Sequence, residues 1–131
     1  MKKRFARLTA LLLALTLSLS FPALAAETAA VIRLTKTTGT VEISKSSGKS
    51  ISLLKNMRLY NGYHVSTEEE SYAWVNLDDS KLLKEDAGSE IEVRKDGKKL
   101  EVLLVSGNLF FDVAEPLEDD ESLNIRTSTT V

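Results

Sequence analysis

Cysteine is absent from this sequence of 131 residues, and histidine and tryptophan occur once each. Without cysteine the chain can form no disulfide, no thiolate nucleophile and no lipid-modified cysteine. Because His64 is the single histidine, a catalytic triad would need serine and aspartate alone to complete it, and a zinc site would lack a second histidine. A Gly-x-Ser-x-Gly nucleophile elbow is also missing. We interpret His64 as an ordinary residue between a turn and a strand, and we expect no enzymatic activity.

The chain also lacks an excess of basic charge. Lysine and arginine number 17 against 19 acidic residues, and four of the basic residues lie within residues 1–25. Residues 26–131 therefore hold 13 basic and 19 acidic residues, a net charge of −6. This acidic balance disfavours nucleic acid or an anionic membrane surface as a partner.

A hydrophobic run of the length typical of a membrane span is missing as well. The basic start Lys2-Lys3-Arg4 is followed by the apolar run Ala10–Phe21 and then by Ala23-Leu24-Ala25, which has the form of a signal-peptidase site. The run is shorter than the ~20 residues that a spanning helix needs. We expect residues 1–25 to be a signal peptide, cleaved before Ala26, and the protein to be secreted or extracytoplasmic, in the periplasm or cell envelope. An uncleaved leader would instead anchor the chain in a membrane.

Residues 26–131 contain no convincing helical pattern. They show short runs of alternating apolar and polar residues separated by turns, of which Asn61-Gly62 and Asp96-Gly97 favour positive φ. Residues 73–77 alternate with the period of a half-buried strand. The pattern predicts an all-β fold, an antiparallel sandwich or roll of many short strands. The predicted core face comprises Ile32, Leu34, Val41, Ile43, Ile51, Leu53, Val65, Ala73, Val75, Leu77, Ile91, Val93, Leu100, Val102, Leu104, Leu109, Phe111 and Val113.

Three acidic clusters remain as candidates for chemistry: Glu68–Glu70, Asp78-Asp79 and Glu118–Glu121. Catalytic carboxylates need a pocket that shifts their pKa values apart, whereas these residues lie in turn-like stretches. None has the ligand spacing of a calcium loop. We interpret the clusters as a solvated acidic surface, and we expect no metal and no cofactor.

The alternation of residues 73–77 also predicts which side chains point away from the core. If the odd-numbered residues of 73–77 face inward, the even-numbered ones face outward, and the same alternation opposite the predicted core residues applies to the strands expected near residues 98–105 and 108–113. Outward apolar side chains in this number form a candidate surface for a protein or a glycan, unless further strands or a loop cover them. The candidate binding residues are Tyr72, Trp74, Leu103, Val105 and Phe110.

Several short motifs occur in a fixed order along the chain. Gly39-Thr-Val-Glu-Ile43 is followed by Asn61-Gly62 with Val65-Ser-Thr67, by Ser71-x-Ala-x-Val-x-Leu-Asp-Asp-Ser80, and by Gly107-Asn-Leu-Phe110. Over nearly all of residues 30–131 this order resembles the FecR domain family. The best known members of that family are inner-membrane regulators whose periplasmic domain receives a signal and passes it to a sigma factor.

The resemblance has two departures. A predicted signal peptide stands where those regulators carry a cytoplasmic sigma-binding segment, so the resemblance implies a secreted, non-catalytic FecR-like domain. In similar domains a closing Ile-x-Thr strand, matched here by Ile125-Arg-Thr127, runs on into at least one more strand. The sequence here ends at Val131. We therefore expect the domain at residues 26–131 to be incomplete at its C-terminus.

The expected function is binding. The first reading is an extracytoplasmic protein-interaction or signal-receiving module. The alternative is a cell-envelope carbohydrate-binding module that stacks sugars on Tyr72 and Trp74. The expected partner is accordingly an extracytoplasmic protein or an envelope glycan, with no nucleic acid, and with the membrane as a partner only if the leader stays uncleaved.

Overall fold

The computed structural model describes residues 31–128, which form eleven strands and no helix, and so no helix that could cross a membrane. The predicted signal peptide and its cleavage site lie outside the described residues. In chain order the strands are β1 (Arg33–Thr38), β2 (Val41–Ser44), β3 (Ser50–Ile51), β4 (Met57–Arg58), β5 (Tyr63–Thr67), β6 (Tyr72–Asn76), β7 (Lys81–Glu85), β8 (Glu90–Asp96), β9 (Lys99–Ser106), β10 (Leu109–Val113) and β11 (Ser122–Thr127).

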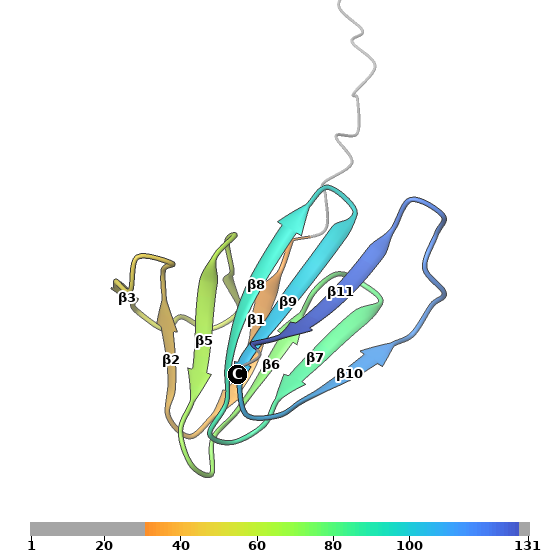
Figure 1. Ribbon diagram of the computed structural model, residues 1–131. Helices are drawn as coiled ribbons and strands as arrows, with labels where there is room; N and C mark the ends of the chain where they lie inside the picture. The colour runs from red at the N-terminus through yellow and green to blue at the C-terminus, as the bar shows by residue number, and fades with distance from the viewer. Residues whose placement is uncertain (1–30, 129–131) are drawn as a thin grey trace, which may run out of the picture.

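The strands form two sheets that pack against each other as a sandwich (Figure 1). Sheet A has five strands in the order β10-β7-β6-β1-β4, and sheet B has six in the order β11-β9-β8-β5-β2-β3. Neighbouring strands are antiparallel, except that β11 runs parallel to β9. The predicted all-β fold is confirmed, with this one parallel pair added.

Three turns form hairpins within one sheet. Ser46–Lys49 joins β2 to β3, Asp78–Ser80 joins β6 to β7, and Asp96-Gly97 joins β8 to β9. The Asn61-Gly62 turn instead carries the chain from β4 in sheet A to β5 in sheet B. Gly62 and Gly97 have φ values of 81° and 56°, the positive values predicted for both positions.

The core lies between the two sheets and is built mainly by the inward residues that the alternation predicted. Residues at its centre, on β5, β6 and β8, are fully buried. Burying a Val, Leu or Ile side chain completely contributes about 1.5–3 kcal/mol relative to leaving it exposed. The buried hydrophobic residues are Ile32, Leu34, Val41, Ile43, Leu59, Val65, Ala73, Val75, Leu77, Leu83, Ile91, Val93, Leu100 and Val102.

The prediction of the core was wrong for Leu53 and Val113, which are 42% and 43% exposed. Leu53 follows the last residue of β3 and lies in the irregular link to sheet A, where no alternation applies. Val113 faces inward but ends β10, a strand at the edge of its sheet. Two buried residues were missed: Leu59, which lies between β4 and β5, and Leu83 on β7.

Two close glycine–serine contacts hold the end of the sandwich where the chain crosses between sheets. Gly39 joins β1 to β2, and a Cβ atom there would lie 2.3 Å from Ser71 Oγ. Gly107 joins β9 to β10, and a Cβ atom there would lie 2.1 Å from Ser89 Oγ. In each case the N–H of the residue after the glycine donates to the serine Oγ, at 2.9 and 3.0 Å. Only glycine leaves room for these hydrogen bonds.

Candidate binding face

The outer face of sheet A carries a row of aromatic and cationic side chains. The register places Lys36 opposite Trp74, and Trp74 opposite Lys84. Lys84 in turn lies opposite Phe110, and residues opposed in this way share a face of the sheet. Tyr72 lies two residues before Trp74 on the same strand and faces the same way. We call this set of five residues the aromatic–cationic face.

Lysine ammonium groups lie over the aromatic rings of this face. Lys36 Nζ is 4.6 Å from the centroid of the Trp74 ring. Lys84 Nζ is 4.9 Å from the Tyr72 ring centroid and 5.4 Å from that of Trp74. The two rings are 6.3 Å apart and tilted by 47°. Each cation–π contact contributes about 0.5–1 kcal/mol at an exposed site. The contacts therefore hold these two lysines and two aromatic rings together in one array.

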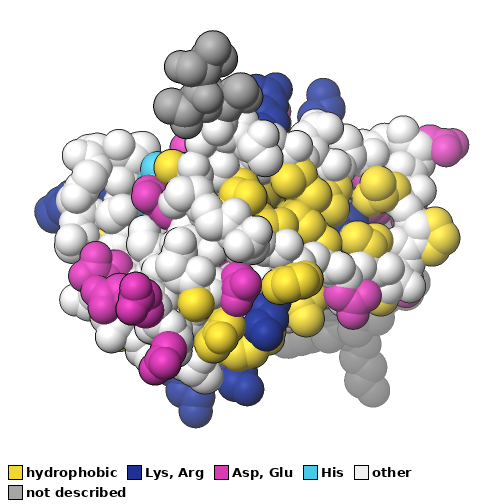
Figure 2. All heavy atoms as spheres, turned by 60° about the horizontal axis from the view of Figure 1, so that its bottom comes forward, with side chains coloured by type: hydrophobic (Ala, Val, Ile, Leu, Met, Phe, Trp, Pro, Cys, Tyr) yellow, Lys and Arg dark blue, Asp and Glu magenta, His cyan; other side chains and the backbone are white. Residues whose placement is uncertain are grey.

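The same face is basic although the domain as a whole is acidic. Arg33 on β1 lies opposite Arg58 on β4, and both exposed side chains extend the row of cations toward the β4 edge. Among the strand residues that point outward from sheet A, Asp112 on β10 is the single acidic one. Near the lower border of the molecule in Figure 2, hydrophobic and basic side chains lie beside one another. An acidic partner would be attracted to this side.

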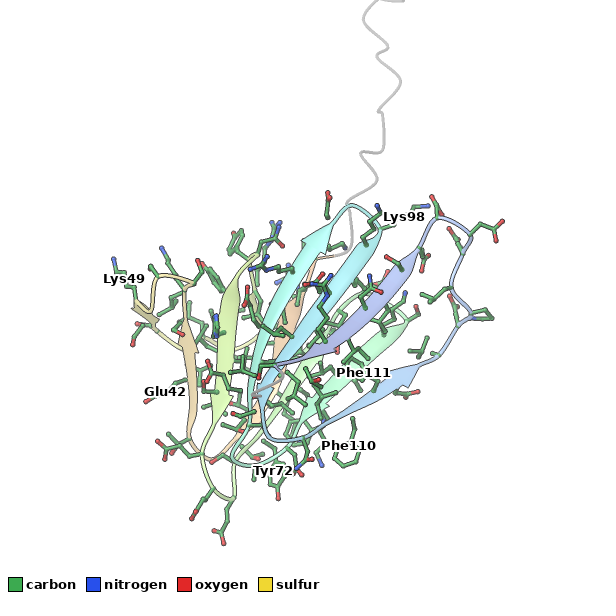
Figure 3. All side chains as sticks on the ribbon, in the orientation of Figure 1. Glu42, Lys49, Tyr72, Lys98, Phe110 and Phe111 are labelled. Carbon is green, nitrogen blue, oxygen red and sulfur yellow. The ribbon has the colours of Figure 1, made fainter. Side chains whose placement is uncertain are left out.

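The structure divides the five predicted binding residues between two faces. Tyr72, Trp74 and Phe110 lie on the outer side of sheet A, and Figure 3 shows Tyr72 and Phe110 on the same, lower side of the ribbon. Leu103 and Val105 lie on β9 and face outward from sheet B, on the other side of the sandwich. The two groups therefore form no single patch. Sequence reasoning also missed the two lysines of the aromatic–cationic face.

His64 lies between two glutamates on the outer face of sheet B. Its Nδ1 atom is 2.9 Å from Glu90 Oε1, and its Nε2 atom is 3.6 Å from Glu92 Oε2. Glu92 also accepts a hydrogen bond from Arg94 Nε at 2.7 Å. Within residues 31–128 no hydroxyl group hydrogen-bonds to His64, and no cluster of His, Asp and Glu could hold a metal ion. This geometry places two carboxylates, and among the described residues no nucleophile, beside the imidazole.

The acidic turns are only partly solvated. Asp78 and Glu121 hold the ammonium group of Lys81 at 2.6 and 3.0 Å, and Lys81 is only 3% exposed. Burial alone would raise the pKa of Asp78, but hydrogen bonds from Lys81 and from the turn backbone outweigh it and hold that pKa below its ordinary value. The prediction of a solvated surface is wrong for these two acids. Lys98 pairs with two further acids of the same loop, and all three of those side chains are exposed.

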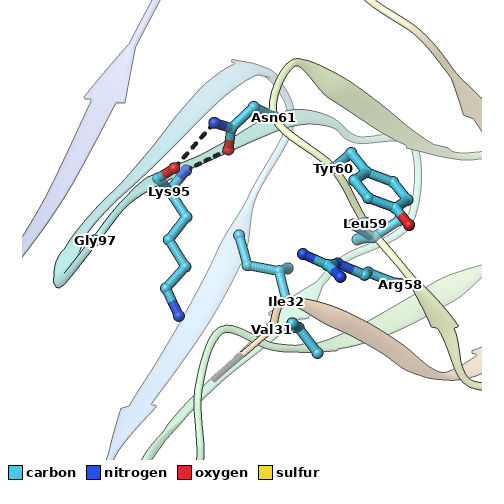
Figure 4. A pocket seen from close by; sticks show the side chains of 8 residues that line it. All are labelled: Val31, Ile32, Arg58, Leu59, Tyr60, Asn61, Lys95 and Gly97. Atoms are coloured by element: carbon cyan, nitrogen blue, oxygen red, sulfur yellow. Dashed lines mark hydrogen bonds between the residues drawn. The ribbon is translucent and has the colours of Figure 1, made fainter. Parts of the chain in front are cut away.

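A small hollow lies beside the Asn61-Gly62 turn (Figure 4). Its volume of about 230 Å³ is below the range of roughly 300–1,000 Å³ typical of ligand pockets. The Asn61 amide donates to the Lys95 carbonyl at 2.9 Å and accepts from the Lys95 N–H at 2.7 Å. These bonds tie the turn to β8, so Asn61 serves the fold. The hollow is lined by Val31, Ile32, Arg58, Leu59, Tyr60, Asn61, Lys95 and Gly97.

Comparisons of the chain with models of protein families, with curated proteins and with solved structures found no match. The resemblance to FecR domains therefore rests on the sequence motifs alone. The function has to be argued from the chemistry of the two outer faces.

Proposed function

We propose that the protein is a non-catalytic binding module that acts outside the cytoplasm and holds an acidic partner protein on the aromatic–cationic face. The observation that carries the proposal is the stacking of Lys36 and Lys84 over Tyr72 and Trp74. Aromatic side chains supply contact area at low cost in conformational entropy, and the lysines supply charge complementarity to carboxylates.

The position of the lysines favours a protein over a neutral glycan. Sugars stack on the faces of aromatic rings, and here the ammonium groups of Lys36 and Lys84 already lie over the Trp74 ring. A neutral sugar would have to displace them, whereas a carboxylate would pair with them where they are. The alternative function is a carbohydrate-binding module that stacks sugars on Tyr72 and Trp74. It is favoured over protein binding if a neutral sugar displaces the two lysine side chains from the rings.

Two further arguments come from the sequence. The predicted signal peptide at residues 1–25 supports a location outside the cytoplasm. The motifs that resemble FecR domains support a signal-receiving role, in which the partner brings the signal. Both belong to the proposal and can be tested separately from the binding face.

Fluorescence provides a direct test, because Trp74 is the only tryptophan of the chain. A synthetic peptide rich in Asp, Glu and Tyr should change the Trp74 emission, with an affinity that falls as salt is added. Lys36→Gln combined with Lys84→Gln should weaken that affinity at least tenfold, a loss of about 1.4 kcal/mol. Lys45→Gln combined with Lys49→Gln, in the exposed β2–β3 turn, changes the net charge equally and should leave it unchanged.

The other outcomes are equally clear. A neutral polysaccharide that binds the doubly substituted Lys36 and Lys84 variant, but not Trp74→Ser, would favour the carbohydrate-binding function. A folded protein whose Trp74 emission responds to no acidic peptide and to no polysaccharide would contradict a binding role for this face.

A further inference from the structure

The sandwich has two free strand edges at one side. β10 is the last strand of sheet A and β11 is the last strand of sheet B. Figures 1 and 3 show them near each other, with Phe111 of β10 directed toward the interior between them and Phe110 directed away. Within residues 31–128 neither strand has a second neighbour.

Backbone hydrogen-bonding groups of both strands point out of the free edges. The N–H of Ala114 and the carbonyl of Asn108 bond to the β7 side, at 2.8 and 3.0 Å. The N–H groups of Ser122 and Ser128 bond to the β9 side, at 3.2 and 3.0 Å. Because the direction alternates along a strand, the odd-numbered residues of both strands present their N–H and C=O groups to the free edge.

Apolar side chains are exposed along the same edges. Val113 and Ile125 lie opposite the buried residues Lys81 and Val102, so they point to the inner side of the sandwich, yet they are 43% and 46% exposed. Phe110 is 60% exposed on the outer side. In Figure 2, hydrophobic side chains gather in the right-hand half of the molecule, where β10 and β11 lie in Figure 1.

Natural edge strands are protected from pairing by lysine, proline or a β-bulge. β10 reads Leu-Phe-Phe-Asp-Val and pairs with β7 without a register shift, so it has no lysine, proline or bulge, and Asp112 is its single charged residue. A strand of this kind is suited to pair with another strand.

We propose that a second copy of this chain covers the two edges, with β10 antiparallel to the β10 of the other copy and β11 antiparallel to the other β11. A two-fold axis relates the copies, so each edge supplies the backbone groups and apolar side chains that its counterpart lacks. A single strand from an unrelated protein would pair with one sheet and leave the other edge open. The second copy satisfies both sheets at once.

The charges of the edge agree with this arrangement. Each strand carries one charged side chain away from its centre, Asp112 on β10 and Arg126 on β11. Antiparallel pairing sets residues of the same face opposite each other, so we place the two-fold axis at Phe111 of β10 and at Ile125 of β11. Asp112 then lies opposite Phe110 of the other copy and Arg126 opposite Asn124, so no like charges meet. The acidic loop Glu118–Glu121 of each copy then lies at the opposite end of the interface from the other loop.

Sedimentation velocity of the exported protein over a range of concentrations tests the proposal. Val113→Lys with Ile125→Lys places two charges in the interface at positions that water already reaches in the monomer. The dissociation constant of the dimer should rise at least tenfold. Leu54→Lys is the matched control, because Leu54 is 64% exposed in the link between β3 and β4, and the same kind of change there should leave the dimer intact.

Cross-linking locates the interface independently, since the chain has no cysteine of its own. Oxidation of a mixture of Phe110→Cys and Asp112→Cys chains should give disulfide-linked dimers, and Leu54→Cys chains should give none. A wild-type protein that stays monomeric at high concentration would overturn the proposal and would favour the further strand predicted from the FecR-like motifs as the occupant of the β11 edge. The proposal would also be overturned by a dimer that the two lysine substitutions leave unchanged, or by assembly that continues beyond the dimer.

Discussion

Glu85 offers the sharpest test of how the core is held together. Its side chain faces inward from β7, opposite Ala73 and Leu109 in the neighbouring strands, and the residue is fully buried. Within the described residues neither carboxyl oxygen has a hydrogen-bond partner. Burial, with a smaller effect of the charge of Glu90, raises the pKa of Glu85 from 4.5 to about 9. The folded protein therefore holds this carboxyl group protonated at neutral pH.

The sign of the effect on stability follows from where the proton is lost. The unfolded chain releases the Glu85 proton near pH 4.5, and the folded chain retains it up to about pH 9. Between these values folding takes up a proton, so the free energy of unfolding falls by about 1.4 kcal/mol for each pH unit. Relative to pH 4.5, the free energy of unfolding is therefore lower by roughly 3 kcal/mol at pH 7 and by roughly 6 kcal/mol at pH 9.

Glu85→Gln keeps the shape of the side chain and removes its titration. At pH 7 the variant should be roughly 3 kcal/mol more stable than the wild type, at pH 8.5 roughly 5 kcal/mol, and near pH 4.5 about equal. Urea unfolding followed by Trp74 fluorescence at a series of pH values measures this difference. Glu69→Gln, in an exposed turn, makes the same substitution outside the core and should run parallel to the wild type.

Parallel pH profiles for the wild type and Glu85→Gln would refute the reasoning. They would mean that the carboxyl group reaches water or a hydrogen-bond donor in solution. A variant less stable than the wild type at pH 8.5 would refute it more strongly.

Two further predictions concern positions with equally specific contacts. Gly107→Ala should lower the melting temperature more than Gly48→Ala, because both have φ near 90° but only at Gly107 would the new Cβ meet Ser89. Strain at positive φ costs about 1 kcal/mol at both sites, and overpacking adds about 1–3 kcal/mol at Gly107 alone, so equal melting curves would contradict the contact. Lys81→Met should lower stability by roughly 2–3 kcal/mol at pH 7, since it leaves two carboxylates unpaired. Because the pKa of Asp78 lies below its ordinary value of 3.8, this difference should shrink in urea melts at pH 3.

The inner faces of the strands could be predicted where one face is uniformly apolar, as in residues 73–77. β7 has no such face, because Lys81-Leu-Leu-Lys-Glu85 offers one leucine and at least one charged residue on either side. The structure buries Lys81, Leu83 and Glu85 together. Lys81 can be buried because Glu121, 40 residues away in the sequence, helps to neutralise it, and Glu85 because it is protonated. Neither the contact of Lys81 with Glu121 nor the protonation of Glu85 can be recognised from the neighbouring residues in the sequence.

The candidate face could be predicted in part for a similar reason. Alternation identifies Tyr72 and Trp74 as residues that point away from the core. It does not tell to which of the two sheets a strand belongs. Leu103 is likewise predicted to face outward, and it lies on the other side of the sandwich. Lys36 and Lys84 join the aromatic rings only through the strand order β1-β6-β7, in which β1 and β6 are neighbours although four strands separate them in the chain.

This arrangement also changes what the net charge implies about partners. The net charge of −6 on residues 26–131 disfavours anionic partners on average, yet a bound partner responds to charges within about 8–10 Å, the screening length at physiological salt. Since packed sheets lie about 10 Å apart, each outer face acts nearly independently of the other. Sheet A presents four cations and one acid. The outward side of the strands of sheet B presents three cations, Arg94, Lys99 and Arg126, and five acids, Glu42, Glu90, Glu92, Asp96 and Glu101. An acidic partner is therefore attracted by one face and repelled by the other, so that the charge pattern sets the orientation in which it binds.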